Sequence, residues 1–206
     1  MPFAVFPLLS TRTGLAKWAQ WIALTIAGVS LGWAVSGAFR FEELTALFFL
    51  PGLTRGLAQW QFFRPLPKAI LWLAPTTLTS PLMGLVVLSM LGRSYPPELD
   101  PPLYARVAAS SVLLALIGLS EFFVLRRWFF HSGLWIPTVT IAWLIAFLLL
   151  QALQAASPAT TYASPSHSTA SAVLQLGLTG AFLGATQAAI TGALIAYLVP
   201  RQLPGA

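Results

Sequence analysis

The sequence contains no cysteine and no asparagine, and only 8% of its residues are charged. The lack of cysteine excludes disulfides, thiol catalysis and thiolate metal sites. The lack of asparagine leaves no acceptor for N-glycosylation. Soluble domains have about 25% charged residues. The low charge and the hydrophobic content of 57% therefore indicate a polytopic membrane protein.

The few charges are placed unevenly along the chain. If the apolar runs cross a membrane in turn, most of the positive charges fall on one side of it, namely Arg12, Lys17, Arg64, Lys68, Arg126, Arg127 and Arg201. The opposite side carries basic residues offset by acidic ones, namely Arg40, Arg93, Arg106, Glu42, Glu43, Glu98 and Asp100. By the positive-inside rule, both termini are expected in the cytoplasm. Topology then explains the net charge of +6, and nucleic acid is not expected as a partner.

Apolar runs long enough to cross a hydrocarbon core of about 30 Å recur along the chain. Helices are expected at roughly 17–38, 44–63, 69–92, 103–126, 134–155 and 172–199. They predict one all-α integral membrane domain over residues 1–206, with short loops. Several tryptophans near the cytoplasmic ends predict an interfacial aromatic belt: Trp18, Trp21, Trp60, Trp72, Trp128 and Trp135.

A short segment recurs three times inside the apolar runs. Its copies are Gly56-Leu57-Ala58-Gln59-Trp60, Gly118-Leu119-Ser120-Glu121-Phe122 and Gly184-Ala185-Thr186-Gln187-Ala188. This recurrence predicts a six-helix transmembrane bundle built from three pseudo-repeated helix hairpins, at about 17–64, 69–126 and 134–199. Each hairpin would place one polar side chain at a similar depth in the membrane.

Two charged residues, Arg55 and Glu121, fall inside the predicted spans. An ionised side chain at mid-bilayer costs several kcal/mol unless it is paired or hydrated. Arg55 and Gln59 share one helix face, and a long arginine can reach the depth of Glu121. We therefore expect an intramembrane polar cluster of Arg55, Gln59, Glu121 and Gln187. Three roles remain open: fixing helix register, forming an ion or substrate pathway, or contacting a partner or cofactor.

The third apolar run is interrupted by its composition. Its middle contains two prolines and four hydroxyl residues, namely Pro75, Thr76, Thr77, Thr79, Ser80 and Pro81. Proline removes a backbone donor, and threonine hydroxyls can bond to the carbonyls that it frees. Interrupted helices often line transporter sites. The simpler interpretation is a kink that neighbouring helices accommodate.

Glycines recur at four-residue spacing in three of the predicted helices, for example at Gly28 and Gly32 and at Gly180 and Gly184. Small residues at this spacing let helix backbones approach closely. We expect these rows to pack within the chain, with contacts between subunits as the alternative.

No arrangement of residues points to catalysis. His131 and His167 fall on opposite sides of the predicted membrane and cannot share a metal. No nucleophile elbow, phosphate loop or dinucleotide fingerprint is present in the sequence. We therefore expect neither enzyme activity nor a metal site, and the residues do not identify a cofactor.

The segment from Gly56 to Trp60, closing on Arg64, resembles the G-x-x-Q-W-x-x-L-R repeat of small uncharacterised polytopic membrane proteins of bacteria, common in cyanobacteria. Phe63 stands where that repeat usually has leucine. Glu121 and Phe122 replace Gln59 and Trp60 in the second copy, and Ala188 replaces the tryptophan in the third. The resemblance implies an architecture and no assigned activity. A photosynthetic host would suggest the thylakoid rather than the bacterial inner membrane.

Three functions are compatible with these features. The first is a non-catalytic membrane subunit or assembly factor that packs against a larger membrane complex. The alternative is a small transporter or substrate-binding component that uses the Arg55/Glu121 cluster and the broken third helix. The third is pigment or lipid binding, with Gln59 or Glu121 as an axial oxygen ligand. A filled centre favours the first function, and a water-accessible polar cavity favours the second.

Overall fold

The computed structural model describes residues 12–38, 44–91, 101–156 and 169–198, and its regular elements in these ranges are all helices. They are α2 (Arg12–Ala38), α3 (Leu44–Phe63), η1 (Ala69–Trp72), α4 (Leu73–Leu78), α5 (Ser80–Leu91), α6 (Leu103–Leu125), η3 (Ser132–Leu134), α7 (Trp135–Ala156) and α8 (Thr169–Leu198). Each of the six predicted apolar runs is helical, so the all-α prediction is confirmed. The third run comprises η1, α4 and α5.

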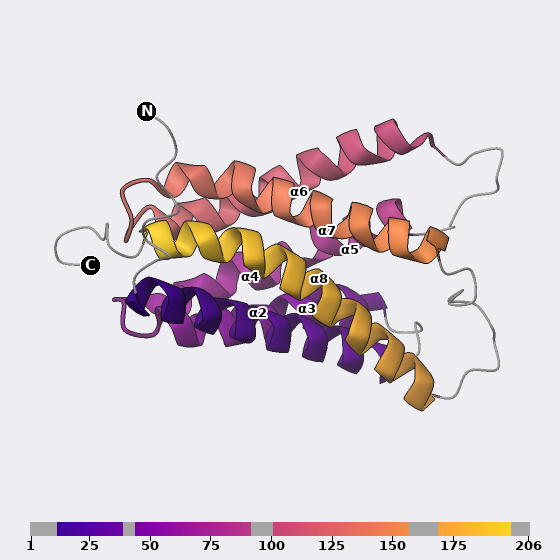
Figure 1. Cartoon of the computed structure of the whole chain (residues 1–206), viewed down its shortest axis with the longest axis horizontal. Helices are drawn as coiled ribbons and strands as arrows, with labels where there is room; N and C mark the ends of the chain where they lie inside the picture. Colours follow the sequence, from indigo (N-terminus) through magenta and orange to yellow (C-terminus); the bar gives the residue numbers. More distant parts are fainter. Residues whose placement is uncertain (1–11, 39–43, 92–100, 157–168, 199–206) are drawn as a thin grey trace.

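The long helices run alternately up and down the bundle (Figure 1). The start of α2 and the end of α8 lie at the same end, on the left of Figure 1, together with the turns at 64–68 and 126–131. We call this the terminal end of the bundle. Because α8 packs along both α2 and α7, the first and last of the described helices are neighbours.

Among the described residues, five segments are long and apolar enough to cross a membrane: Gly14–Ser36, Ala69–Val87, Leu103–Leu125, Ser132–Leu153 and Val173–Leu198. The remaining long helix, α3, carries Arg55, Gln59 and Gln61 within its 20 residues. Large apolar side chains cover the outside of the bundle, and Leu78 in the third run is 71% exposed. Polar groups inside and leucines outside are typical of a helical membrane protein.

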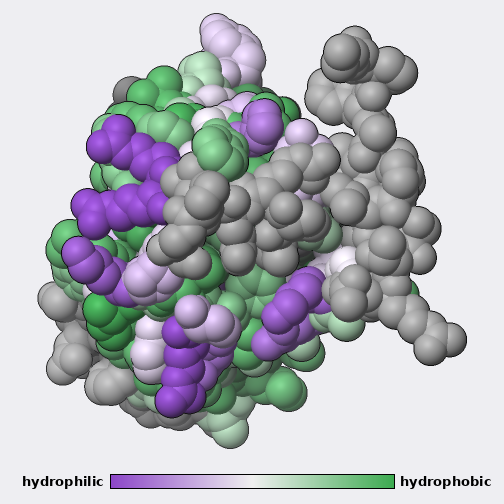
Figure 2. All heavy atoms as spheres, turned by 90° about the vertical axis from the view of Figure 1, so that its left-hand side faces the viewer, coloured by the Kyte–Doolittle hydropathy of each residue, from purple (hydrophilic) through white to green (hydrophobic). Residues whose placement is uncertain are grey.

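Exposed basic side chains gather at the terminal end. Figure 2 looks onto this end and shows hydrophilic side chains on a largely hydrophobic surface. The exposed bases there are Lys17, Arg64, Lys68, Arg126 and Arg127. The charged residues and the histidine predicted for the other side of the membrane lie outside the described residues, namely Arg40, Glu42, Glu43, Arg93, Glu98, Asp100 and His167.

Glycines bring helices of this chain into very close contact. A Cβ atom added at Gly32 of α2 would lie 2.4 Å from Oγ1 of Thr54 on α3. One added at Gly180 of α8 would lie 2.9 Å from Cβ of Trp33 on α2. These rows therefore pack within the chain, as the four-residue spacing predicts.

The third helix breaks where its composition predicts. The segment α4 ends at Leu78, Thr79 has φ −90° and ψ −1°, and α5 begins at Ser80. The Thr79 hydroxyl donates to the Pro75 carbonyl at 2.6 Å, and the Thr76 hydroxyl donates to the Trp72 carbonyl at 3.0 Å. Threonine hydroxyls thus bond to backbone carbonyls around the break, although Oγ1 of Thr77 is buried without a partner.

The predicted aromatic belt is wrong for four of its six tryptophans. Trp21, Trp72, Trp128 and Trp135 are at most 2% exposed. Their indole N–H groups all have hydrogen-bond partners within the chain: those of Trp21, Trp72 and Trp135 donate to buried side chains, and that of Trp128 donates to the Pro67 carbonyl in the 64–68 turn at 3.0 Å. A tryptophan near a span end can be buried when a neighbouring helix supplies an acceptor.

Candidate functional site in the bundle interior

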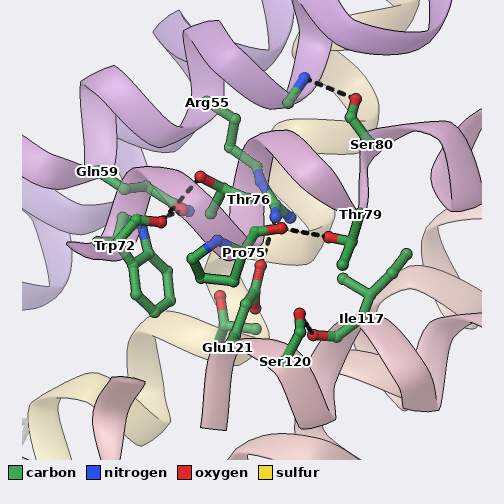
Figure 3. A network of polar contacts seen from close by, with 12 residues as sticks. Arg55, Gln59, Trp72, Pro75, Thr76, Thr79, Ser80, Ile117, Ser120 and Glu121 are labelled. Atoms are coloured by element: carbon green, nitrogen blue, oxygen red, sulfur yellow. Dashed lines mark hydrogen bonds and ion pairs between the residues drawn. The ribbon is translucent and has the colours of Figure 1, made fainter. Parts of the chain in front are cut away.

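A buried ion pair joins α3 to α6. Nη2 of Arg55 donates a hydrogen bond to Oε1 of Glu121 (Figure 3). Arg55 is 6% exposed and Glu121 is 1% exposed. The indole N–H of Trp135 donates to the second carboxylate oxygen, Oε2, at 2.7 Å. The pair expected from the depth of these residues is therefore present, and both oxygens of the carboxylate accept a hydrogen bond.

Gln59 lies one helical turn from Arg55 but has different partners. Its Nε2 donates to the Thr25 hydroxyl at 3.0 Å, and its Oε1 accepts from the indole N–H of Trp72 at 3.3 Å. Within the described part of the chain, no hydrogen bond links Gln59 to Arg55 or Glu121. We expected one network of Arg55, Gln59 and Glu121. The structure instead has two adjacent networks, one around the Arg55–Glu121 pair and one around Gln59.

Gln187 does not join the Arg55 cluster. Its Nε2 donates to the Thr191 hydroxyl at 3.2 Å, and Trp21 donates to the same hydroxyl at 3.0 Å. Its Oε1 is buried without a partner. The inclusion of Gln187 in the cluster is wrong because α8 packs mainly against α2 and α7, whereas Arg55 and Glu121 lie on α3 and α6.

Buried tryptophans are the part of the site that the sequence pattern did not identify. Trp72 and Trp135 follow Gln59 and Glu121 by 13 and 14 residues, and each donates to that polar side chain. Trp72 is the last residue of η1 and Trp135 is the first residue of α7, so each lies near the start of the helical run that follows its acceptor. This similar spacing is the signal that could have found them.

The tryptophan rings pack together toward the terminal end. The ring centroid of Trp135 lies 5.9 Å from that of Trp21 and 6.0 Å from that of Trp72, and both pairs pack edge to face. Phe63 packs 4.8 Å from Trp72 and 5.4 Å from Trp128. We call Trp21, Phe63, Trp72, Trp128 and Trp135 the aromatic plug, because it closes this end of the interior.

A small cavity lies on the other side of Arg55, toward the end away from the termini. Its volume is about 20 Å³, and the lining side chains with polar atoms are Arg55, Thr76, Thr79, Ser80 and the indoles of Trp33 and Trp143. A cavity of this size holds about one water molecule. Three residues of the broken helix thus line a site, as expected, whereas Pro75, Thr77 and Pro81 do not line it.

The described residues contain no group of three or more histidine, cysteine, aspartate or glutamate side chains that could hold a metal ion. The arrangement is instead that of a buried ion pair, held by an indole donor and placed beside a small polar cavity. It can orient helices and bind a small polar species.

Comparisons with models of known protein families, with curated proteins and with solved structures found no match. The resemblance to repeat-containing bacterial membrane proteins therefore remains a prediction from the motif.

Proposed function

We propose that this protein is a non-catalytic integral membrane protein, a subunit or assembly factor that packs against a larger membrane complex. The observation that supports this most is the filled interior. The aromatic plug occupies the terminal end, the Arg55–Glu121 pair occupies the middle, and the cavity beside Arg55 measures only about 20 Å³. That cavity has no room for an organic substrate.

The outer surface offers a place for a partner helix. A shallow groove of about 420 Å³ runs between α6 and α7 and is almost entirely apolar. Its lining includes several small residues; the full set is Ser111, Val112, Ala115, Ile136, Pro137, Thr140 and Ile141. Small residues at an interface let a second transmembrane helix approach closely. We propose that a helix of another subunit occupies this groove.

Photo-crosslinking in native membranes tests the proposal. A photoreactive amino acid at Val112 or Ile141, which are 62% and 52% exposed, lies in the groove. We expect each to give one discrete crosslinked protein. Leu31 on α2 is 56% exposed and lies outside the groove, so the same probe there serves as the control and should label lipid. Lipid labelling alone at all three positions would argue against a partner helix.

The proposal includes an architecture and a location. The architecture is three pseudo-repeated helix hairpins, supported by the indole donors beside Gln59, Glu121 and the Gln187–Thr191 pair. The location is a bacterial inner membrane or a thylakoid membrane, with both termini in the cytoplasm. The exposed basic side chains at the terminal end support this orientation.

One observation favours transport as a second candidate function. The cavity lies beside a buried arginine and a broken helix, which is the kind of place where transporters bind their cargo. Its volume restricts any cargo held there to a species about the size of one water molecule.

Pigment binding has less support. Oε1 of Gln59 accepts a hydrogen bond from Trp72, and both oxygens of Glu121 accept hydrogen bonds from neighbouring side chains. The oxygens that would act as axial ligands are therefore engaged within the protein.

A further inference from the structure

Arg55 has more hydrogen-bond donors than the protein uses. A guanidinium carries five N–H groups, and the ion pair with Glu121 engages one terminal nitrogen. The described residues provide no other acceptor for this side chain. The guanidinium also lies over the ring of Trp143, whose centroid is 6.0 Å from Cζ. Arg55 lines the cavity, so its remaining N–H groups are available to a ligand there.

Two other lining residues add unused donors. Oγ of Ser80 accepts from the backbone N–H of Gly52 at 3.0 Å, and no acceptor for its own proton lies in the described residues. Trp143 is 3% exposed, and its indole N–H is buried without a partner. A buried donor without a partner carries a desolvation penalty of roughly 1–3 kcal/mol. A ligand in the cavity would remove part of this penalty.

The side-chain acceptors in the cavity lining are neutral hydroxyl oxygens. No carboxylate lines the cavity. The hydroxyls of Thr76 and Thr79 donate their protons to backbone carbonyls and so add no donor to it. A water molecule must itself donate two hydrogen bonds, whereas an anion only accepts. One cationic and two neutral groups with unused donors, facing no charged acceptor, therefore favour an anion over water.

We propose that this cavity binds one monovalent, halide-sized anion, with Arg55, Ser80 and Trp143 as donors. Glu121 does not line the cavity but neutralises Arg55 through the ion pair. The anion therefore shares one positive charge with Glu121, which limits its affinity in the wild-type protein. Removing the charge of Glu121 should strengthen binding. This inference is independent of the α6–α7 groove and goes beyond the proposed function.

Thermal unfolding of the purified full chain tests the site. A ligand that binds only the folded state raises Tm in a saturable way. Unfolding would be followed in sodium bromide and in sodium gluconate of equal ionic strength, because gluconate is too large for the cavity. We expect a saturable rise of Tm in bromide for the wild type and a larger rise for Glu121→Gln. The double variant Arg55→Gln with Glu121→Gln, which has no buried charge, should show no such rise.

Trp143→Phe is the variant that separates binding from folding. It removes a donor without a protein partner and also shortens a buried ring, so each variant's bromide response is measured against its own stability in gluconate. Bromide affinity should fall roughly three- to tenfold, the range expected for one hydrogen bond. Equal bromide responses in the wild type and the double variant, or no response at all, would overturn the proposal. Anomalous diffraction from bromide beside Arg55 would support it, and a water there in a bromide-soaked crystal would overturn it.

Discussion

The Arg55–Glu121 pair shows how a charge is tolerated inside a bundle of this composition. Each residue alone would be expensive away from water, and burying both as a pair recovers that cost only with good geometry and further hydrogen bonds. Here the further bond comes from Trp135, which donates to Glu121 at 2.7 Å. The pair therefore contributes little net stability while it is intact, but the loss of one partner leaves an uncompensated charge.

Glu121→Gln should lower the free energy of unfolding by about 3–5 kcal/mol, the usual cost of breaking a buried pair. Adding Arg55→Gln should recover much of that loss, because it removes the uncompensated charge. The thermal unfolding of both variants would be measured in detergent and in lipid, with gluconate as the only added anion. An unchanged Tm for Glu121→Gln would show that the two residues do not depend on each other.

At the scale of the elements, the close packing of α3 against the broken third helix positions the site. A Cβ atom at Gly56 would lie 2.3 Å from Oγ1 of Thr76. One at Gly52 would lie 2.4 Å from both Cβ of Ser80 and the Thr76 carbonyl oxygen. Only glycine allows this approach, and the approach lets Gly52 donate to the Ser80 hydroxyl beside Arg55.

Gly56→Ala should therefore destabilise the protein by about 1–3 kcal/mol, the usual cost of overpacking. Gly133→Ala is the matched control, because nothing lies within 4 Å of a Cβ at that position. It should change stability by less than about 0.5 kcal/mol. Chemical unfolding of both variants measures the difference. Similar values would mean that the α3 contact is not tight in solution.

At the scale of the whole molecule, the interior is polarised along the bundle axis. The aromatic plug lies toward the terminal end, the ion pair lies next to it, and the small cavity lies beyond Arg55. The exposed bases gather on the same side as the plug (Figure 2). This asymmetry predicts a single orientation in the membrane.

Because the chain contains no cysteine, single introduced cysteines can report that orientation. Gly133→Cys lies near the terminal end, and Tyr104→Cys lies at the opposite end, where Tyr104 is 79% exposed. An impermeant maleimide applied to intact cells should label Tyr104→Cys at once. It should label Gly133→Cys only after the membrane is permeabilised. The reverse pattern would place both termini outside the cytoplasm.

The sequence by itself determined the helices, the break in the third helix and the presence of a buried pair. Helix positions follow from long apolar runs, and the predicted 44–63 helix has the same bounds as α3. The break follows from Pro75, Pro81 and the hydroxyl residues between them. The pair follows from the cost of two lone charges in lipid, which is a property of the residues alone.

Only the tertiary structure decided which side chains meet. Helix periodicity does not say how each helix is rotated against its neighbours, so it could not separate Gln59 and Gln187 from the ion pair. It also could not distinguish a tryptophan at the membrane interface from one buried beside an acceptor, as with Trp72 and Trp135. The cavity beside Arg55 likewise exists only because α2 to α7 converge there. Such contacts depend on packing between residues far apart in the chain, which helix periodicity does not specify.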